Sequence, residues 1–231
     1  MKILSENETI DFLKKGWSLG RFGDGELQNL IVKKKNISKL QEYDPRLRKK
    51  LLEVLFNPID NFLIGIPRMN NPKNWVKTFH SKFKKIVPIH DKLILCSAFI
   101  SRPSIVSIQS EEYFENLSGI WQNRECVIVN FNTNLLSHPL IKNCERADFI
   151  KISRQNCFAD YAEIYKRCLS YHKNRLFLIS AGPSATCLAY DLAKYGFQSI
   201  DIGQVFFEYG LYKEHEGIEK WTSQGEYRRR I

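Results

Sequence analysis

Asp24 and Glu26 lie one residue apart near the start of the chain, and glycine precedes and follows the aspartate. If the backbone turns here, the two carboxylates can converge on one hard divalent cation, which takes oxygen ligands and often completes its shell with substrate phosphates. Gly23 and Gly25 permit the positive φ angles that such a turn can require. Arg21 could form a forked contact with a phosphate. A plain surface turn, in which the same residue types are common, is the alternative.

A second segment joins the apolar run that ends at Ser180 to a series of small residues. It predicts a strand that passes through a tight turn into a helix starting at Pro183. Free N–H groups at such a helix start can bind a phosphate, which makes Gly182, Pro183 and Ser184 candidate binding residues. The turn lacks the lysine of a Walker loop and the spacing of GxGxxG. A tight connection with small residues for packing is the alternative.

A third segment follows the last apolar run and carries Asp201 and Glu208, with Gly203 and Gln204 between them. Either carboxylate could serve as a metal ligand or a general base. The alternative is a helix cap for Asp201 and a solvated helix face for Glu208.

The elements that must position these groups alternate between strand and helix. Apolar runs predict strands at 17–22, 62–66, 93–96, 126–130, 149–152, 176–180 and 199–202. Helical spacing and caps predict helices from Ser5 to about Gly16 and at 27–34, 45–55, 75–87, 134–144, 161–171 and 183–195. This alternation implies an α/β fold, Rossmann-like, with a mostly parallel sheet flanked by helices. Ligands bind beyond the carboxyl ends of such strands, so we expect the three segments to meet there as turns.

The 231 residues suit one domain spanning 1–231. The six cysteines form no CxxC pair and have no histidine at zinc-ligand spacing, and several lie in apolar runs. They are therefore interpreted as buried thiols in a reducing compartment. No signal peptide is recognisable, and no apolar run approaches the roughly 20 residues that span a bilayer. We expect a cytoplasmic protein of undetermined oligomeric state.

The formal net charge of +10 favours anionic partners such as nucleic acid, nucleotide phosphates or an anionic membrane face. The lysines are spread over several segments, whereas nucleic-acid binders concentrate charge on one face among stacking aromatics. The basic amphipathic helix at 75–87, together with Arg228 to Arg230, could provide a peripheral contact with the inner face of a membrane. A solvated helix whose apolar stripe packs on the core is the alternative.

Taken in order, these segments resemble the glycosyltransferases of the GT-D fold, a family first recognised as a bacterial domain of unknown function. The run at 21–26 resembles the family's Asp-x-Glu motif, and the likeness continues at 41–45, 98–102, 120–121, 182–185, 188–192 and 201–203. It implies one Rossmann-like domain and a divalent metal, manganese before magnesium, held by Asp24 and Glu26. It also implies a UDP-sugar donor, with UDP-glucose as the leading candidate. Family members add a sugar to an existing glycan in bacterial surface-glycan or glycoprotein assembly.

The chain departs from the family at two places. The family's Gly-His-x-Asp-x-Glu-Tyr reads Gly-Gln-Val-Phe-Phe-Glu-Tyr at 203–209. The segment at 130–134, which usually carries an acidic residue, glycine and arginine, reads Asn-Phe-Asn-Thr-Asn. These differences concern the sugar and the acceptor more than the metal and the nucleotide.

The resemblance implies that the metal offsets charge on the leaving UDP, while arginines contact its phosphates. The expected donor-binding residues are Arg21, Gly23, Gly25, Arg102, Gly182, Pro183, Ser184, Gly203 and Gln204. Glu208, or as second choice Asp201, would take the proton of the acceptor hydroxyl in an inverting reaction. The acceptor would be a glycan or lipid-linked glycan, with no nucleic acid expected.

The main rival is a non-enzymatic nucleotide or nucleic-acid binding domain. It would not explain acidic pairs at strand ends, which repel phosphate unless a cation intervenes. A Rossmann-type methyltransferase fits less well because acidic residues follow the first strand. A serine hydrolase lacks its GxSxG motif here.

Overall fold

Eight strands form one sheet in the order β1-β4-β3-β2-β8-β7-β5-β6, and all of its strand pairs are parallel. The computed structural model describes residues 3–31, 40–68, 74–83, 85–86 and 93–214. The strands are β1 (Ile3–Leu4), β2 (Ser18–Arg21), β3 (Phe62–Ile66), β4 (Ile94–Ser97), β5 (Glu125–Asn130), β6 (Arg146–Lys151), β7 (Leu176–Ile179) and β8 (Gln198–Asp201). The predicted single α/β domain is confirmed, and its sheet is wholly parallel.

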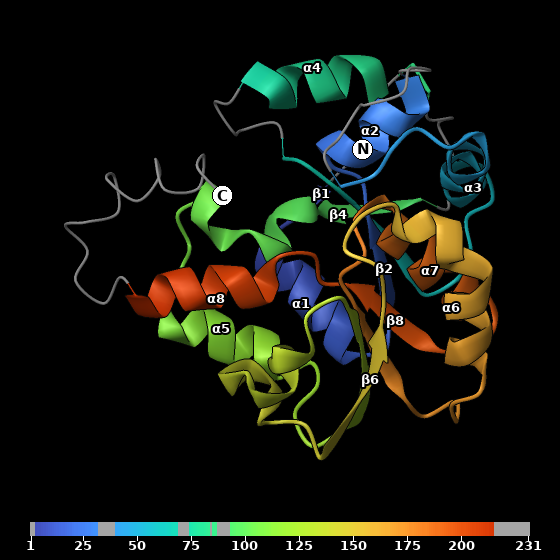
Figure 1. Ribbon diagram of the computed structural model, residues 1–231. Helices are drawn as coiled ribbons and strands as arrows, with labels where there is room; N and C mark the ends of the chain where they lie inside the picture. The colour runs from blue at the N-terminus through green and yellow to red at the C-terminus, as the bar shows by residue number, and fades with distance from the viewer. Residues whose placement is uncertain (1–2, 32–39, 69–73, 84, 87–92, 215–231) are drawn as a thin grey trace.

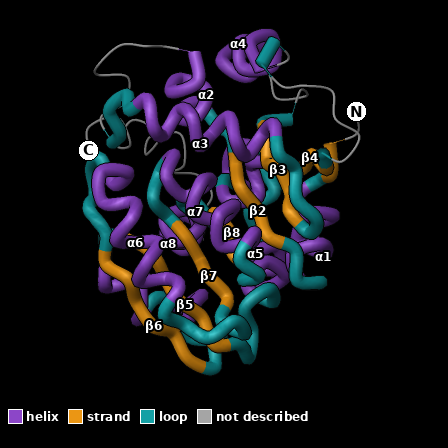
Figure 2. The backbone as a smooth tube through the Cα atoms, turned by 90° about the vertical axis from the view of Figure 1, so that its right-hand side faces the viewer, coloured by secondary structure: helices purple, strands orange, loops and turns teal. Residues whose placement is uncertain are grey.

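Helices cover both faces of this sheet (Figure 1), and Figure 2 shows the strands between them. One face carries α1 (Glu6–Lys14), α5 (Glu111–Ser118) and α8 (Val205–Glu214). The other carries α2 (Asp24–Ile31), α3 (Pro45–Phe56), α6 (Tyr161–Leu169) and α7 (Pro183–Lys194), with α4 (Asn74–Phe83) against α2. Five short 3-10 helices complete the fold: η1 (Ala98–Ser101), η2 (Pro103–Ile105), η3 (Thr133–Ser137), η4 (Pro139–Ile141) and η5 (Cys157–Asp160).

Alternating side chains along the strands build two hydrophobic cores, one on each face. In β5, Cys126 and Ile128 face the α1–α5–α8 side, while Val127 and Val129 face the α3–α6–α7 side. All four are fully buried. A strand buried on both faces reads as a continuous apolar run, which is why the central strands were predictable.

Local capping explains where several helices begin. Ser5 and Glu8 form a complete capping box at α1, as their spacing predicts. Asp44 accepts the N–H of Arg46 at the start of α3, and Pro45 occupies the first turn. Ser110 caps α5 in the same way, although α5 was absent from the predicted elements.

Three predicted connections have a different structure. The expected turn at Gly23 to Glu26 is the start of α2, which begins at Asp24, because Glu26 folds back onto the N–H of Gly23. The helix expected at 134–144 is replaced by η3 and η4, which Pro139 separates. The segment after Asp201 continues into α8, so Glu208 lies within a helix.

The basic helix predicted at 75–87 is observed as α4, while residues 84 and 87 and Arg228 to Arg230 lie outside the described residues. The membrane contact stays a prediction. Within the described part of the chain, no helix is long and apolar enough to cross a membrane.

The site is positioned by the pairing of β2 with β8 in the middle of the sheet, where Leu19 lies opposite Ile200. From β2 the chain proceeds outward through β3 and β4, whereas β8 is reached from the other half through β5, β6 and β7. The strand order therefore reverses between β2 and β8. Crevices beyond the carboxyl ends of strands at such a switch point are where open α/β sheets bind ligands.

Candidate active site

Arg21, the last residue of β2, joins the ends of three segments at this switch point. Its Nε donates to the backbone oxygen of Asp201 at 2.8 Å, and its Nη2 donates to the Asp201 carboxylate at 2.8 Å. Its Nη1 donates to the Ala98 oxygen and to the Ser101 hydroxyl. Every side-chain nitrogen of Arg21 thus has a protein acceptor. Arg21 holds β2, β8 and η1 together, and direct contact with a phosphate stays a prediction.

Gly203 lies directly against this arginine. Its φ is +49°, and a Cβ at this position would overlap the Arg21 guanidinium. Its N–H donates to the Asp201 carboxylate at 3.1 Å. The position therefore requires glycine both for its backbone conformation and for the close approach of the guanidinium.

Glu26 is a buried carboxylate that accepts a short hydrogen bond from the backbone. It is 9% exposed, and its Oε2 accepts the N–H of Gly23 at 2.7 Å. Burial, followed by repulsion from Asp201, raises the pKa of Glu26 from 4.5 to about 7, although Gly23 and Arg21 act in the opposite direction. Within the described part of the chain, no lysine or arginine nitrogen lies within ion-pair distance of Glu26.

The other buried carboxylates along this edge each have an arginine partner. Asp201 pairs with Arg21 as described above. Glu6 pairs with Arg68 at 3.0 Å and accepts the Ser97 hydroxyl, and Glu208 lies 3.9 Å from Arg102. Glu26 is the exception, because no lysine or arginine among the residues that the structure describes pairs with its buried carboxylate. Such a group is costly unless a cation or proton neutralises it.

Asp24 supplies the second oxygen donor of the predicted metal site. It is the first residue of α2 and is exposed, and its Oδ1 accepts the Gly25 N–H at 3.0 Å. No group of three or more His, Cys, Asp or Glu residues able to hold a metal occurs among the described residues. An ion bound by Asp24 and Glu26 would therefore need further oxygens from a ligand or water. Carboxylate oxygens completed by phosphate and water oxygens are the donor set that a hard divalent cation such as manganese or magnesium takes.

The start of α7 lies beside the start of α2. A Cβ on Gly25 would come 3.3 Å from the Pro183 ring. Gly182, with φ at +56°, precedes α7 without a side-chain cap, and a Cβ there would meet nothing within 4 Å. The N-termini of α2 and α7 therefore meet at the predicted donor-binding segment. At α2 the N–H groups of Gly23 and Gly25 already donate to Glu26 and Asp24. The start of α7 has no side-chain cap, so phosphate binding is favourable there. Ser184 is buried in the first turn of α7, so its backbone N–H suits phosphate binding better than its hydroxyl does.

The predicted proton acceptors are both buried. Glu208 is 0% exposed and accepts the Ser104 N–H at 3.3 Å, besides its arginine partner. Asp201 is 2% exposed. Arg102 is partly exposed at the start of η2, and Gln204 is exposed just before α8. The structure thus brings Glu26 together with Arg21, Asp201 and Gly203. Glu208 and Arg102 form a separate pair. The general base stays a prediction.

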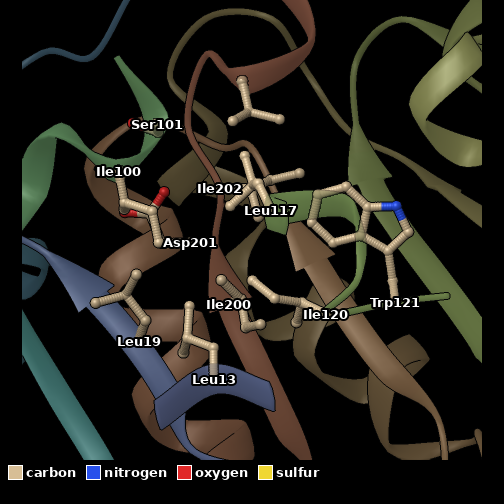
Figure 3. Close-up of a pocket in the computed structure, with 11 residues that line it drawn as sticks. Leu13, Leu19, Ile100, Ser101, Leu117, Ile120, Trp121, Ile200, Asp201 and Ile202 are labelled. Atoms are coloured by element: carbon tan, nitrogen blue, oxygen red, sulfur yellow. The ribbon is translucent and has the colours of Figure 1, made fainter. Parts of the chain in front are cut away.

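A small apolar cavity lies under the switch point, as Figure 3 shows, with Ser101 and Asp201 on one side and Trp121 on the other. Its volume is about 10 Å³, which leaves room for roughly one water molecule. The cavity is therefore too small for a nucleotide.

The side chains of two residues at the site had no assigned role in the sequence. Thr186 is fully buried in α7, donates to the Arg21 backbone oxygen at 2.6 Å and lies 3.4 Å from the Asp201 carboxylate. Ser101 accepts from Arg21. Both lie within motifs that were noted, but nothing in the sequence indicates their contacts with β2.

Two solved structures resemble this fold over most of the chain. One is described as "The highly conserved domain of unknown function 1792 has a distinct glycosyltransferase fold". It is 28% identical with a TM-score of 0.79 and covers 93% of this chain and 82% of its own. The other, "A New Glycosyltransferase (DUF1792) from Streptococcus sanguinis", is 25% identical with a TM-score of 0.77, over 92% and 85% of the two chains.

Two named relatives are streptococcal. "Probable glycosyl transferase Gly" of Streptococcus gordonii is 30% identical over 90% of this chain. "Glycosyltransferase GlyD" of Streptococcus pneumoniae serotype 4 is 27% identical over 88%. The chain spans only 33% and 26% of the lengths of these relatives. The model of the family described as "Glycosyltransferase GT-D fold" matches residues 19–224, which include β8, all of β2 except Ser18, and the site between them. The chain therefore belongs to the GT-D fold family of glycosyltransferases.

Proposed function

We propose that this chain is a metal-dependent hexosyltransferase that uses a UDP-sugar, with UDP-glucose as the leading donor. Its acceptor would be a bacterial surface glycan, a glycoprotein glycan or a lipid-linked glycan. One observation carries the proposal: no arginine in the described residues pairs with buried Glu26, which follows exposed Asp24 in the first turn of α2, beside the start of α7. A cation bound between these carboxylates and a diphosphate at the helix starts would neutralise the negative charge of the carboxylates and of the diphosphate.

Asp24 and Glu26 would hold manganese or magnesium, and the bound ion would supply positive charge against the charge that develops on the leaving diphosphate. The N–H groups at the start of α7 would orient the phosphates. Arg21 fixes Asp201 and Gly203 next to Glu26, so it acts on the site by positioning its walls. An inverting reaction also needs a base, for which Glu208 and then Asp201 remain the candidates.

The rival function is a non-enzymatic nucleotide or nucleic-acid binding domain. It predicts binding that does not require a metal and that weakens steeply with salt. The transferase predicts that UDP stabilises the protein only when manganese is present, because the carboxylates otherwise repel the diphosphate.

Asp24→Asn provides the test, since Asp24 is exposed and its replacement should leave the fold intact. We expect the variant to lose both the manganese-dependent rise in melting temperature with UDP and the hydrolysis of UDP-glucose. Asp11→Asn is the matched control, because Asp11 is an exposed aspartate on α1. If Asp24→Asn binds UDP and manganese as the native protein does, the proposed metal site is wrong.

A further inference from the structure

Phe131 is an exposed aromatic residue at the same edge of the sheet as the proposed metal site. It directly follows β5, and its side chain is 43% exposed. The guanidinium of Arg154, in the loop after β6, lies 5.4 Å from the centre of its ring. Arg154 is itself exposed. We call this pair the Phe131–Arg154 platform.

The platform is continuous with the site through the strand ends. The N–H of Ser180, at the turn before α7, donates to the oxygen of Val129 in β5. β5 is three strands from β2 in the sheet order, which is about 14 Å at the usual strand spacing of about 4.8 Å. A reacting hydroxyl must approach the transferred sugar to roughly 3–3.5 Å. The platform therefore lies outside the reacting position, where a neighbouring residue of a longer acceptor would pass.

Hydrogen bonds order the backbone close to both platform residues. The Asn130 side chain accepts the Asn132 N–H at 2.9 Å, and the Asn132 side chain accepts the N–H of residue 134 at 3.1 Å. On the other side, the N–H of Asn156 donates to the oxygen of Leu40, and the Asn156 side chain accepts the N–H of Glu42 at 2.8 Å. A surface ordered before binding loses less conformational entropy when a ligand arrives.

The chemistry of the pair suits a pyranose. The ring offers an apolar face to the C–H groups of a sugar. The guanidinium and the neighbouring asparagine amides offer N–H donors to its hydroxyl groups. A nucleobase would need a different setting, because sites for small ligands are concave and usually bury 70–90% of the ligand. Phe131, Asn132 and Arg154 are all exposed, which fits a glycan chain that remains largely in water.

We propose that Phe131 and Arg154 bind a sugar residue of the acceptor glycan, adjacent to the residue that is glycosylated. The proposal rests on the proposed transferase function, because it assumes that a glycan crosses this edge toward Asp24 and Glu26. It assigns a binding role to the segment at 130–134, where the chain departs from the family pattern.

Saturation-transfer NMR with lactose, cellobiose and N,N′-diacetylchitobiose tests the platform without catalysis. We expect the native protein to bind at least one of these disaccharides. Phe131→Ala should weaken this binding about fivefold to tenfold, while Phe131→Tyr, which keeps the ring, should retain it. Phe56→Ala is the matched control, because Phe56 is 48% exposed at the end of α3. Binding of UDP with manganese should be unchanged in all three variants.

Three results would overturn the platform: no binding of any of the disaccharides, sugar binding that Phe131→Ala leaves unchanged, or loss of UDP affinity in that variant. The last result would identify Phe131 as a nucleobase contact. Failure of the native protein to bind UDP with manganese would instead count against the proposed function. The two failures are therefore distinguishable.

Discussion

Replacing Glu26 with glutamine should stabilise the protein above neutral pH, although it removes a predicted metal ligand. Glutamine has nearly the same shape and can still accept the Gly23 N–H. The pKa of Glu26 is 4.5 in the unfolded chain and about 7 in the fold, so the folded state binds the proton more tightly. The free energy of unfolding therefore falls as the pH rises through this interval. The whole difference corresponds to roughly 3 kcal/mol, which the neutral amide avoids.

Urea and thermal denaturation at pH 5 and pH 8, without added metal, measure this effect. At pH 5 the native protein and Glu26→Gln should unfold at similar temperatures. At pH 8 the variant should melt roughly 6–12 °C higher, given the usual relation for a domain of this size. Glu53→Gln on α3 is the control with the opposite sign, because a hydrogen bond from Lys194 lowers the pKa of Glu53.

Manganese with UDP should reverse the order at pH 8, because ligands stabilise only the protein that binds them. The native protein should gain stability, whereas Glu26→Gln should not. A Glu26→Gln variant that is less stable than the native protein at pH 8 without metal would contradict this expectation. That result would mean that the fold itself stabilises the ionised carboxylate, so that no bound cation is needed.

The remaining predictions concern the contacts around Arg21. Gly203→Ala should destabilise the fold by roughly 1–3 kcal/mol in urea denaturation, because its φ is positive and a Cβ would meet the Arg21 guanidinium; a neutral effect would mean that the arginine moves freely. Asp201→Asn should cost roughly 2–4 kcal/mol, because it leaves Arg21 without its buried carboxylate. It should also lower the pKa of Glu26, which a shift of the pH-dependent stability change to lower pH would reveal.

The sequence was informative where local chemistry decides the structure. The capping box at Ser5 and the cap at Asp44 are complete within four residues, and both helices begin where predicted. The central strands are buried on both faces and were recognisable as apolar runs. By contrast, α8 was not among the predicted helices. Phe206 and Tyr209 are buried while Phe207 between them is exposed, so aromatic residues lie on both sides of this helix and show no helical period. Gly210 also interrupts the run. The two-residue strand β1 is too short to produce a pattern.

The candidate site depends on contacts that no local pattern encodes. The acidic pair at 24 and 26 was identified from spacing, but the burial of one carboxylate and the exposure of the other follow from tertiary packing. Arg21 was expected to face a phosphate, yet its Nε and Nη2 donate to Asp201, which lies 180 positions away in the sequence. Only the order of strands in the sheet brings these two residues together.

The central place of β8 has a consequence for biosynthesis. The sheet consists of β1-β4-β3-β2 on one side and β7-β5-β6 on the other, and β8 connects them. A nascent chain that has left the ribosome only as far as α7 can form both part-sheets but cannot join them, since domains fold as their segments emerge. Joining segments so distant in sequence is slow. The site can therefore form only after β8 has been synthesised, and a chain that stops before β8 would have neither the Arg21–Asp201 contacts nor a complete crevice.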